Sequence, residues 1–305
     1  MAFRFGLIGI GRFGKNYARV ITQNPHAKLV AVCSKTKKTL NDSKKFLPKN
    51  TIATTDPFDI IESKEIDCII IATPSSTHFE LARKTIENEK HVLCEKPMAI
   101  NLSQAISLNK ILQKSDRTFM VGHQFVYNDY INYLKTKIKN NFLGKTRFAI
   151  AQHFYPGPIR EDIGCLWDAG THQLSVLQHI FSPGQIVHVN ASSNYISSKK
   201  KDDFSSAEIK FENGLTALLS VCWLFPEKTR NFVFIGDKKT TVFDDVVQEA
   251  KLKFFPTKSA VPKNALVPKI VAKEPLQNEL NHFIDCVKTK KEPLTGIQSS
   301  LEITR

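Results

Sequence analysis

The chain has no apolar run of the length that crosses a bilayer. A transmembrane helix needs about 20 consecutive apolar residues, and no stretch of the 305 residues approaches that length. The first residues, MAFRFGLIGIG, are apolar but lack the basic segment and the small-residue cleavage site of a signal peptide. We therefore expect a cytoplasmic protein whose first residues form a strand.

Closely spaced cysteines are also missing. The six cysteines include no CxxC pair, and most stand in apolar stretches such as DCIII and VLCEK. Zinc sites and redox centres use clustered cysteines, so the pattern predicts reduced, buried thiols and neither disulfides nor a metal site. A catalytic cysteine nucleophile remains the less favoured alternative.

Acidic residues are few beside the basic ones. The sequence has 29 Asp and Glu against 43 Lys and Arg, a formal net charge of +14. Such a charge attracts anions, including nucleic acid, membrane surfaces and phosphorylated small molecules. The lysines, however, fall in scattered turn-like clusters, with no aromatic-interleaved basic strand and no recognition-helix pattern. This favours solvated surface lysines over a nucleic-acid interface.

Internal repeats and low-complexity linkers are absent, yet the apolar pattern changes once along the chain. Up to about residue 120, continuous apolar runs such as IDCIIIATP alternate with helical spacing such as RFGKNYARVITQ, which predicts a parallel sheet covered by helices. Later segments are short strands joined by turns such as ENG and GDKK, typical of an antiparallel sheet. We predict a doubly wound α/β domain over residues 1–121 and an α+β domain, with a large, mainly antiparallel open sheet, over 122–305.

A glycine-rich turn follows the first predicted strand. GLIGIGRFG places Gly9, Gly11 and Gly14 in GxGxxG spacing between a strand and a helix. The first glycine permits the tight turn, the second lets the backbone approach a pyrophosphate, and the third lets the helix pack closely on the sheet. Phosphate then binds at the helix N-terminus. The predicted dinucleotide loop is Gly9, Ile10, Gly11, Arg12, Phe13 and Gly14.

An acidic residue is missing where the second strand ends. NAD-binding domains carry an acid there to bond the ribose hydroxyls, whereas this chain reads AVCSKTKK, and its next carboxylate is Asp42. Ser34 and Lys35, with Lys37 and Lys38 behind them, suit the 2′-phosphate of NADP. We therefore predict NAD(P) as cofactor with a preference for NADP; the alternative is a plain lysine-rich turn.

A lysine and a histidine stand out as candidate catalytic groups. Lys96 follows the apolar strand HVLCE and precedes Pro97, which fixes the backbone. At the carboxyl end of a parallel strand, its ammonium would face a ligand crevice and bond a substrate hydroxyl. Asp168 and His172 lie four apart, within reach on a helix, as a general base requires. The alternatives are a surface lysine and a structural histidine.

Four motifs in this order resemble one family. GxGxxG, ATPSSTH, EKP and WDAGTH make the chain similar, over nearly its whole length, to the glucose–fructose oxidoreductase/inositol dehydrogenase (GFO/IDH/MocA) family. The resemblance implies a Rossmann domain and then an open-sheet domain, a homodimer or homotetramer built through that sheet, and sugar or polyol oxidoreduction. It implies Lys96 as catalytic lysine, His172 as acid/base group and Asp168 as its companion.

The same resemblance implies further binding residues. Thr73, Pro74, His78 and Glu95 would line the cofactor together with Lys96. The stretches VGHQFVYND and GPIREDIGCLWDAGTH are similar to a branch that acts on nucleotide-linked sugars, including 3-dehydrogenases of UDP-N-acetylhexosamines.

Three residues in these stretches have two interpretations each. Arg160 would clamp a phosphate or stay at the surface, and Tyr127 and Trp167 would stack on a sugar or base or fill the domain interface.

The sequence therefore predicts an NAD(P)-dependent sugar or nucleotide-sugar dehydrogenase. His172 would take the hydroxyl proton, Lys96 would polarise the oxygen, and hydride would pass to the nicotinamide, so these two side chains should converge above that ring. A dinucleotide-sensing regulator without catalysis is the alternative, but a sensor needs only the glycine loop. A small-molecule sugar substrate is expected, with no nucleic-acid or membrane partner.

Overall fold

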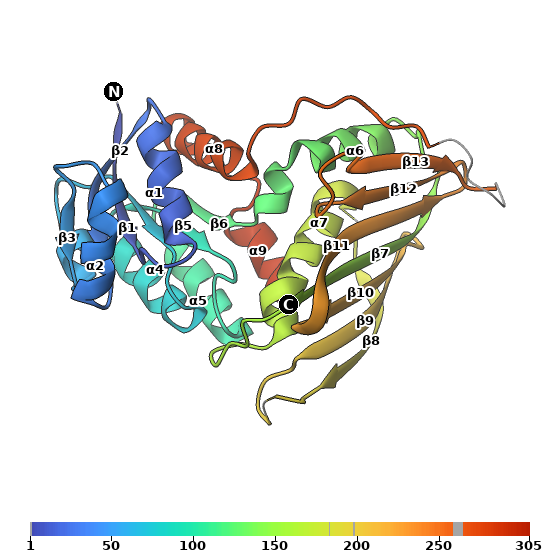
Figure 1. Ribbon diagram of the computed structural model, residues 1–305, viewed down its shortest axis with the longest axis horizontal. Coiled ribbons are helices and arrows are strands. Elements are labelled where there is room, and N and C mark those ends of the chain that lie inside the picture. Colours follow the sequence, from blue (N-terminus) through green and yellow to red (C-terminus); the bar gives the residue numbers. More distant parts are fainter. Residues whose placement is uncertain (1, 183, 198, 259–264) are drawn as a thin grey trace. The chain divides into compact units, whose positions relative to one another are not determined.

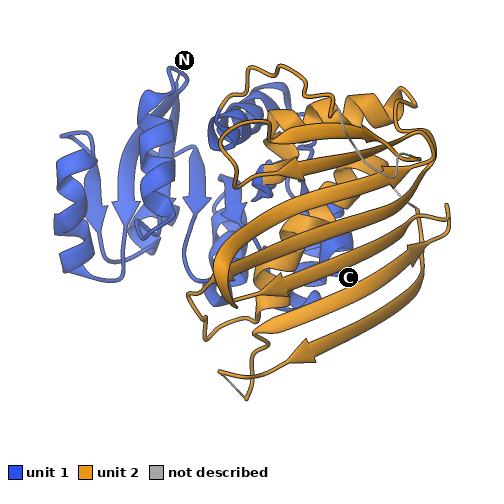
Figure 2. Cartoon of the chain, turned by 45° about the vertical axis from the view of Figure 1, so that its right-hand side comes forward, with its two compact units in different colours: residues 1–124, 274–305 blue, residues 125–273 orange. Residues whose placement is uncertain are grey.

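The chain folds into two compact units. A computed structural model describes residues 2–182, 184–197, 199–258 and 265–305. Residues 1–124 and 274–305 form the first unit and residues 125–273 form the second (Figure 2). The sequence predicted one boundary, at 121/122. The structure differs because the chain returns, and its last segment belongs to the first unit.

A six-stranded parallel sheet forms the centre of the first unit. Its order is β3-β2-β1-β4-β5-β6, so the order reverses between β1 and β4, where open α/β sheets bind their ligands. This confirms the predicted doubly wound fold (Figure 1). The strands are β1 (Phe3–Ile8), β2 (Ala27–Cys33), β3 (Ile52–Thr54), β4 (Cys68–Ile71), β5 (His91–Glu95) and β6 (Phe119–Gly122).

The connecting helices form where apolar residues recur with helical spacing. In α1 (Gly14–Gln23), Tyr17, Ala18, Val20 and Ile21 are buried. In β4, by contrast, all four residues (sequence CIII) are buried, as in strands covered on both faces. The other crossover helices are α2 (Lys37–Ser43), α3 (Phe58–Ile61), α4 (His78–Glu87) and α5 (Leu102–Leu112).

Two C-terminal helices complete the first unit. α8 (Pro275–Thr289) packs against α1, and α9 (Ile297–Thr304) packs against α5 and β6. Thr295, between them, donates its hydroxyl to the Val121 carbonyl at 2.7 Å and accepts the Val121 N–H at 2.9 Å. The segment therefore bonds directly to β6.

The second unit is a seven-stranded sheet with helices α6 (Asp129–Lys139) and α7 (Thr171–Phe181) in its core. The strand order is β13-β12-β11-β7-β10-β9-β8; β7 and β10 run parallel and the other neighbours antiparallel. This confirms the predicted mainly antiparallel sheet. The strands are β7 (Thr146–Pro156), β8 (Ile186–Asn194), β9 (Phe204–Phe211), β10 (Thr216–Cys222), β11 (Leu224–Gly236), β12 (Lys239–Asp244) and β13 (Leu252–Pro256).

The two faces of this sheet differ in burial. Ala149 and Ala151 on β7 and Ala217 on β10 are buried in the core that contains α7. The alternating residues Phe148 and Leu218 point the other way and are 48% and 41% exposed. One face of the sheet therefore carries exposed apolar side chains.

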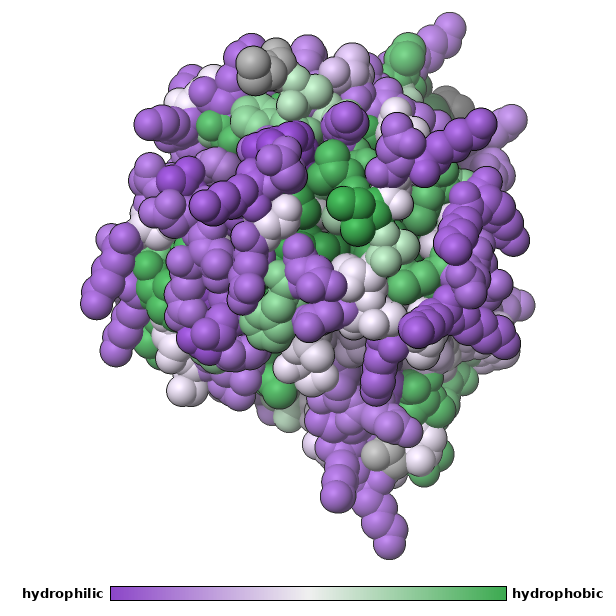
Figure 3. All heavy atoms as spheres, turned by 90° about the vertical axis from the view of Figure 1, so that its left-hand side faces the viewer, coloured by the Kyte–Doolittle hydropathy of each residue, from purple (hydrophilic) through white to green (hydrophobic). Residues whose placement is uncertain are grey.

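The cysteines lie in the interior, and several lysines lie at the surface. All six cysteines are buried free thiols, and burial raises the pKa of Cys33 and of Cys286 to about 11, against a nucleophilic role. Lys37, Lys38 and Lys44 are exposed on α2 and the turn after it. Figure 3 looks at this side of the molecule and shows hydrophilic side chains over most of it.

Among the residues that the structure describes, neither a membrane-spanning helix nor a metal-binding cluster is found. Within the described ranges, every helix is too short or too polar to cross a membrane. The same residues contain no group of three or more His, Cys, Asp or Glu side chains able to hold a metal ion.

The return of α8 predicts a stability effect. Phe283 is fully buried and its ring meets the ring of Phe5 on β1 edge-on, with centroids 6.2 Å apart. Phe283→Ala should therefore lower the free energy of unfolding by about 3–5 kcal/mol, measured by urea unfolding. The control is Val271→Ala, at an apolar position that is 99% exposed. Equal unfolding midpoints for the two variants would contradict a core role for α8.

Candidate active site

The glycine turn lies at the carboxyl end of β1 and packs against the end of β4. Gly9 has a φ of +99°, which favours glycine, and a Cβ there would lie 2.5 Å from the Ala72 carbonyl oxygen. A Cβ at Gly14 would lie 1.8 Å from the Gly9 carbonyl oxygen. Only glycine therefore lets α1 start this close to the strand.

Gly11 differs from its two neighbours in the motif. A Cβ at Gly11 would meet no atom within 4 Å, and the residue is exposed. No side chain caps the N-terminus of α1 and its first turn has no acid, so no carboxylate competes with an anion for the positive end of the helix dipole. The turn thus fits a dinucleotide pyrophosphate, with space where the motif requires close approach.

The motifs ATPSSTH and EKP lie on neighbouring strands at the same sheet edge. The ring of His78 joins them, because Nδ1 is 2.8 Å from the Pro97 carbonyl oxygen and Nε2 is 2.8 Å from that of Thr73. His78 is only 1% exposed. The structure therefore gives His78 a contact that fixes two loops, where the sequence predicted a cofactor contact; Thr73 and Pro74 lie in the loop that it holds.

Lys96 directly follows β5, with a half-buried side chain. Its backbone N–H donates to Glu95 Oε2 at 3.2 Å, and the Lys96–Pro97 peptide bond is cis. The preceding Glu95 is buried and accepts a hydrogen bond from the Tyr17 hydroxyl at 2.7 Å. Glu95, which the sequence predicted to line the cofactor, thus accepts one bond from the Tyr17 hydroxyl and one from the Lys96 backbone.

The end of β2 is polar without a carboxylate of its own. Ser34 follows the strand and donates its N–H to the Thr54 carbonyl at 3.1 Å, and Lys35 is exposed. Asp56 and Asp59, after β3, lie close enough for their charges to help raise the pKa of Cys33 at the end of β2. These two acids act on the strand end from the neighbouring strand, and sequence reasoning did not identify them.

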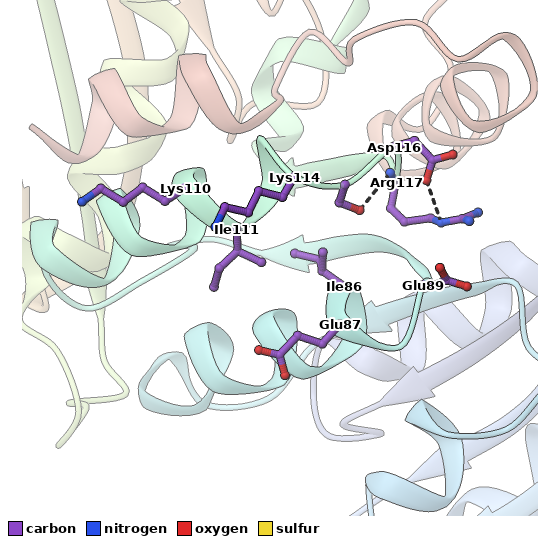
Figure 4. Close-up of a pocket in the computed structure, with 9 residues that line it drawn as sticks. Ile86, Glu87, Glu89, Lys110, Ile111, Lys114, Asp116 and Arg117 are labelled. Atoms are coloured by element: carbon purple, nitrogen blue, oxygen red, sulfur yellow. Dashed lines mark hydrogen bonds and ion pairs between the residues drawn. The ribbon is translucent and has the colours of Figure 1, made fainter.

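A surface depression lies at the opposite edge of the same sheet. Figure 4 shows side chains there from α4, α5 and the segments that lead into β5 and β6, with Arg117 paired to Asp116 at 3.1 Å. These segments precede their strands, so the depression is at the amino ends. The lining residues are Ile86, Glu87, Glu89, Lys110, Ile111, Lys114, Ser115, Asp116 and Arg117. It is therefore separate from the glycine turn and Lys96.

In the second unit, a short π-helical segment, Leu166–Gly170, carries Asp168 and leads into α7. Its start is held by Asp202, whose Oδ2 accepts the Leu166 N–H at 2.8 Å. Gly164 makes room for this carboxylate, since a Cβ there would lie 1.6 Å from Asp202 Oδ1. Asp202 therefore sets where the WDAGTH motif begins.

Asp168 is the end of a buried hydrogen-bond chain. Trp223 donates its indole N–H to the Tyr155 oxygen at 2.6 Å, and Tyr155 donates its hydroxyl to Asp168 Oδ2 at 2.8 Å. Burial and the Asp168 charge raise the pKa of Tyr155, which keeps it a donor. The chain fixes the Asp168 carboxylate, and neither Tyr155 nor Trp223 was foreseen from the sequence.

His172 lies in the first turn of α7 among aromatic rings. Its ring meets Phe125 edge-on at 5.4 Å and lies 5.9 Å from the ring of His153 on β7. The next residue, Gln173, donates to the carbonyls of Ala151 and Ser220 at 2.9 Å each and so ties α7 to two strands. His153 was missed, although a histidine that continues the buried alternation of Ala149 and Ala151 is a usable signal.

Arg160, Tyr127 and Trp167, each with two interpretations from the sequence, differ in their contacts and burial. Arg160 makes two hydrogen bonds to Asp162, at 3.0 and 2.9 Å, and an ion pair to Asp168 at 3.5 Å, so its charge is compensated within the unit. Tyr127 is buried and Trp167 is half-buried. Lys96 belongs to the first unit and His172 to the second.

Both halves of the chain match known family models. Residues 3–123 match the model described as the oxidoreductase family, NAD-binding Rossmann fold, and residues 131–242 match the GFO/IDH/MocA C-terminal domain. The chain belongs to the GFO/IDH/MocA family. The family predicted from the four motifs is therefore confirmed.

Relatives of this GFO/IDH/MocA chain include proteins named as dehydrogenases and oxidoreductases, and one named as a hydratase. The uncharacterized oxidoreductase YrbE of Bacillus subtilis is 25% identical, over 95% of this chain and 88% of the relative. Myo-inositol 2-dehydrogenase of Thermotoga maritima is 24% identical, over 79% and 72%. The solved UDP-N-acetylglucosamine 3-dehydrogenase GnnA of Acidithiobacillus ferrooxidans has the same fold, with a TM-score of 0.85 and 20% identity over 100% and 95%. The chain is an oxidoreductase of this family with an NAD(P)-binding Rossmann domain.

The three glycines of the family turn predict separable effects. Gly11→Ala should lower dinucleotide affinity roughly tenfold or more, about 1.4 kcal/mol, without changing the thermal midpoint, because its Cβ meets only the space for the cofactor. Gly14→Ala should lower the midpoint itself, because its Cβ meets the Gly9 carbonyl. Fluorescence titration with NADPH and thermal unfolding measure the two effects; unaltered affinity in Gly11→Ala would refute the assignment.

Proposed function

We propose that this enzyme transfers hydride between a hydroxyl-bearing carbon of a sugar, polyol or nucleotide sugar and NAD(P), with Lys96 and His172 as its reacting groups. One observation carries the proposal. Lys96 leaves the carboxyl end of β5 on the sheet edge that also bears the glycine turn after β1, with the ATPSSTH loop of β4 between them in strand order. A cation there is available to the substrate of a dinucleotide enzyme.

Each protein group would have a defined task. When bound, the cofactor supplies hydride acceptance and donation at its nicotinamide. Gly9, Gly11 and Gly14 would hold the pyrophosphate at the N-terminus of α1. Lys96 would donate a charge-assisted hydrogen bond to the substrate oxygen, which favours negative charge on that oxygen as the proton leaves.

His172 would accept the hydroxyl proton in oxidation and return it in reduction. A neighbouring carboxylate supports an imidazolium, and Asp168 lies four residues earlier, fixed by Tyr155 and Arg160. In this arrangement Asp168 keeps a fixed position and charge while the imidazole changes protonation. His153, 5.9 Å from His172 between ring centroids, is a further polar group on the same side of the sheet.

The substrate is proposed from the relatives and the residues together. One relative is named for myo-inositol and one structural neighbour for UDP-N-acetylglucosamine, both cyclic polyhydroxyl compounds. The net charge of +14 favours an anionic nucleotide sugar. Against a phosphate clamp at Arg160 stands its pairing with Asp162 and Asp168, which a phosphate would have to replace.

A homodimer or homotetramer through the second unit is part of the proposal. Phe148 and Leu218 leave apolar area on the outer sheet face, and Val187 and Val189 on the edge strand β8 are 64% and 54% exposed. Exposed apolar groups of this kind gain free energy when a second surface covers them.

Removal of the Lys96 ammonium tests the catalytic proposal. Lys96→Ala should lower kcat on the order of 10²–10³-fold, as for other groups that stabilise charge in a transition state, while NADPH affinity stays nearly unchanged. A panel of myo-inositol, glucose and UDP-N-acetylglucosamine with NAD⁺ and NADP⁺, followed by nicotinamide absorbance, measures it. Lys114→Ala, in the depression of Figure 4, is the matched control. Retained turnover in Lys96→Ala would refute the role.

The strand end at Ser34 tests the preference for NADP. We expect tighter binding of NADPH than of NADH, because Ser34 and Lys35 offer a hydroxyl and a cation to a 2′-phosphate. Ser34→Asp should reverse the order, since a carboxylate bonds ribose hydroxyls and repels the phosphate. Titration of the unaltered protein and of Ser34→Asp with NADPH and NADH measures the ratio of the two dissociation constants. A clear NADH preference of the unaltered protein would overturn the expectation.

A further inference from the structure

A pair of glutamates shares one tyrosine inside the first unit. The Tyr17 hydroxyl oxygen, on α1, lies 2.7 Å from Glu95 Oε1 at the end of β5 and 2.9 Å from Glu279 Oε1 on α8. Tyr17 and Glu279 are fully buried, and Glu95 is 9% exposed. Gly122 on β6 closes the cluster, because a Cβ there would lie 2.9 Å from Glu95 Oε1 and 3.1 Å from the Tyr17 oxygen.

The cluster is short of one proton if both glutamates are charged. A phenol carries a single hydrogen and can donate to one carboxylate only. The second short contact would then set a carboxylate oxygen against a phenol lone pair, in a buried place where an unmade hydrogen bond is costly. Both contacts become hydrogen bonds when one glutamate is protonated and donates to the phenol oxygen.

The surroundings decide which glutamate holds that proton. Glu95 has a second bond, since its Oε2 accepts the Lys96 backbone N–H at 3.2 Å. Glu279 Oε2 is buried and has no hydrogen-bond partner among the described residues. Burial first, and then the charge of Glu95, raise the pKa of Glu279 well above its usual range. The proton therefore belongs on Glu279.

The protonation of Glu279 affects Lys96 through two hydrogen bonds. The protonated Glu279 donates a hydrogen bond to the Tyr17 oxygen, and the Tyr17 hydroxyl donates to Glu95. Glu95 stays charged and also accepts the backbone N–H of Lys96. We propose that Glu279 is a neutral carboxylic acid which, through Tyr17, fixes Glu95 and so positions Lys96. The positioning part rests on the function proposed above for Lys96. The protonation of Glu279 stands independently of it.

A spectroscopic experiment tests the proton directly. In the full chain at neutral pH, infrared difference spectra between the unaltered protein and Glu279→Gln should show the carbonyl stretch of a protonated carboxyl group, lost in the variant. A band that is absent, or that persists in Glu279→Gln, places no proton on Glu279 and overturns the proposal. This readout needs no substrate, so it remains decisive if the panel of sugars gives no turnover.

Kinetics test the positioning. Tyr17→Phe removes the bond to Glu95 and should lower kcat roughly tenfold, the equivalent of one hydrogen bond to a charged group, with NADPH affinity unchanged. Glu279→Gln should restrict the loss to a few-fold, because the amide N–H donates as the acid does. Both are measured with the member of the sugar panel that gives turnover, after circular dichroism confirms the fold.

Each kinetic outcome has one meaning. A fall in kcat for Tyr17→Phe with near-normal Glu279→Gln supports positioning. Unchanged kcat in Tyr17→Phe, or an equal loss of kcat and NADPH affinity, refutes it. If Lys96→Ala itself retains turnover, the function proposed for Lys96 fails, and the infrared result alone decides the state of Glu279.

Discussion

The close approach of α1 to the end of β1 is the constraint from which the binding edge follows. No side chain fits between the Gly9 carbonyl and Gly14, because a Cβ at Gly14 would lie only 1.8 Å from the Gly9 carbonyl oxygen. Because the helix starts there, the positive end of its dipole lies at the carboxyl edge of the sheet, where the loops after β4 and β5 also lie. An anion site and a lysine therefore share one edge through backbone geometry alone.

The second unit fixes its polar groups by another means. Its sheet carries helices in one core, and α7 is joined to β7 and β10 by the buried amide of Gln173. The neighbouring Asp168 is held by Tyr155, itself bonded to Trp223. Buried hydrogen bonds of this kind favour one arrangement of the helix and strands, which the role proposed for His172 requires of its surroundings.

Local patterns predicted much of this structure, and long-range contacts did not. The spacing of the glycines predicted the turn after β1, and the apolar run of β4 predicted a strand of a parallel sheet. Nothing in the local sequence indicated that Phe283 on α8 would meet Phe5 on β1, 278 positions away. The spacing of Asp168 and His172 suggested a companion four residues away. Tyr155 bonds Asp168 from β7 and is itself bonded by Trp223, and no local spacing encodes these contacts.

The return of the C-terminal segment has a chemical consequence as well as a structural one. α8 buries Glu279 against Tyr17 and Glu95, so the last part of the chain adds an acid beside the strand that ends at Lys96. A leucine at this position would fill the same space at less cost in desolvation. A buried acid is stable here only if it is neutral and hydrogen-bonded, and then it leaves the negative charge on Glu95, next to the lysine backbone. The contact of Glu279 with Tyr17 thus both joins α8 to the first unit and bears on the position of Lys96.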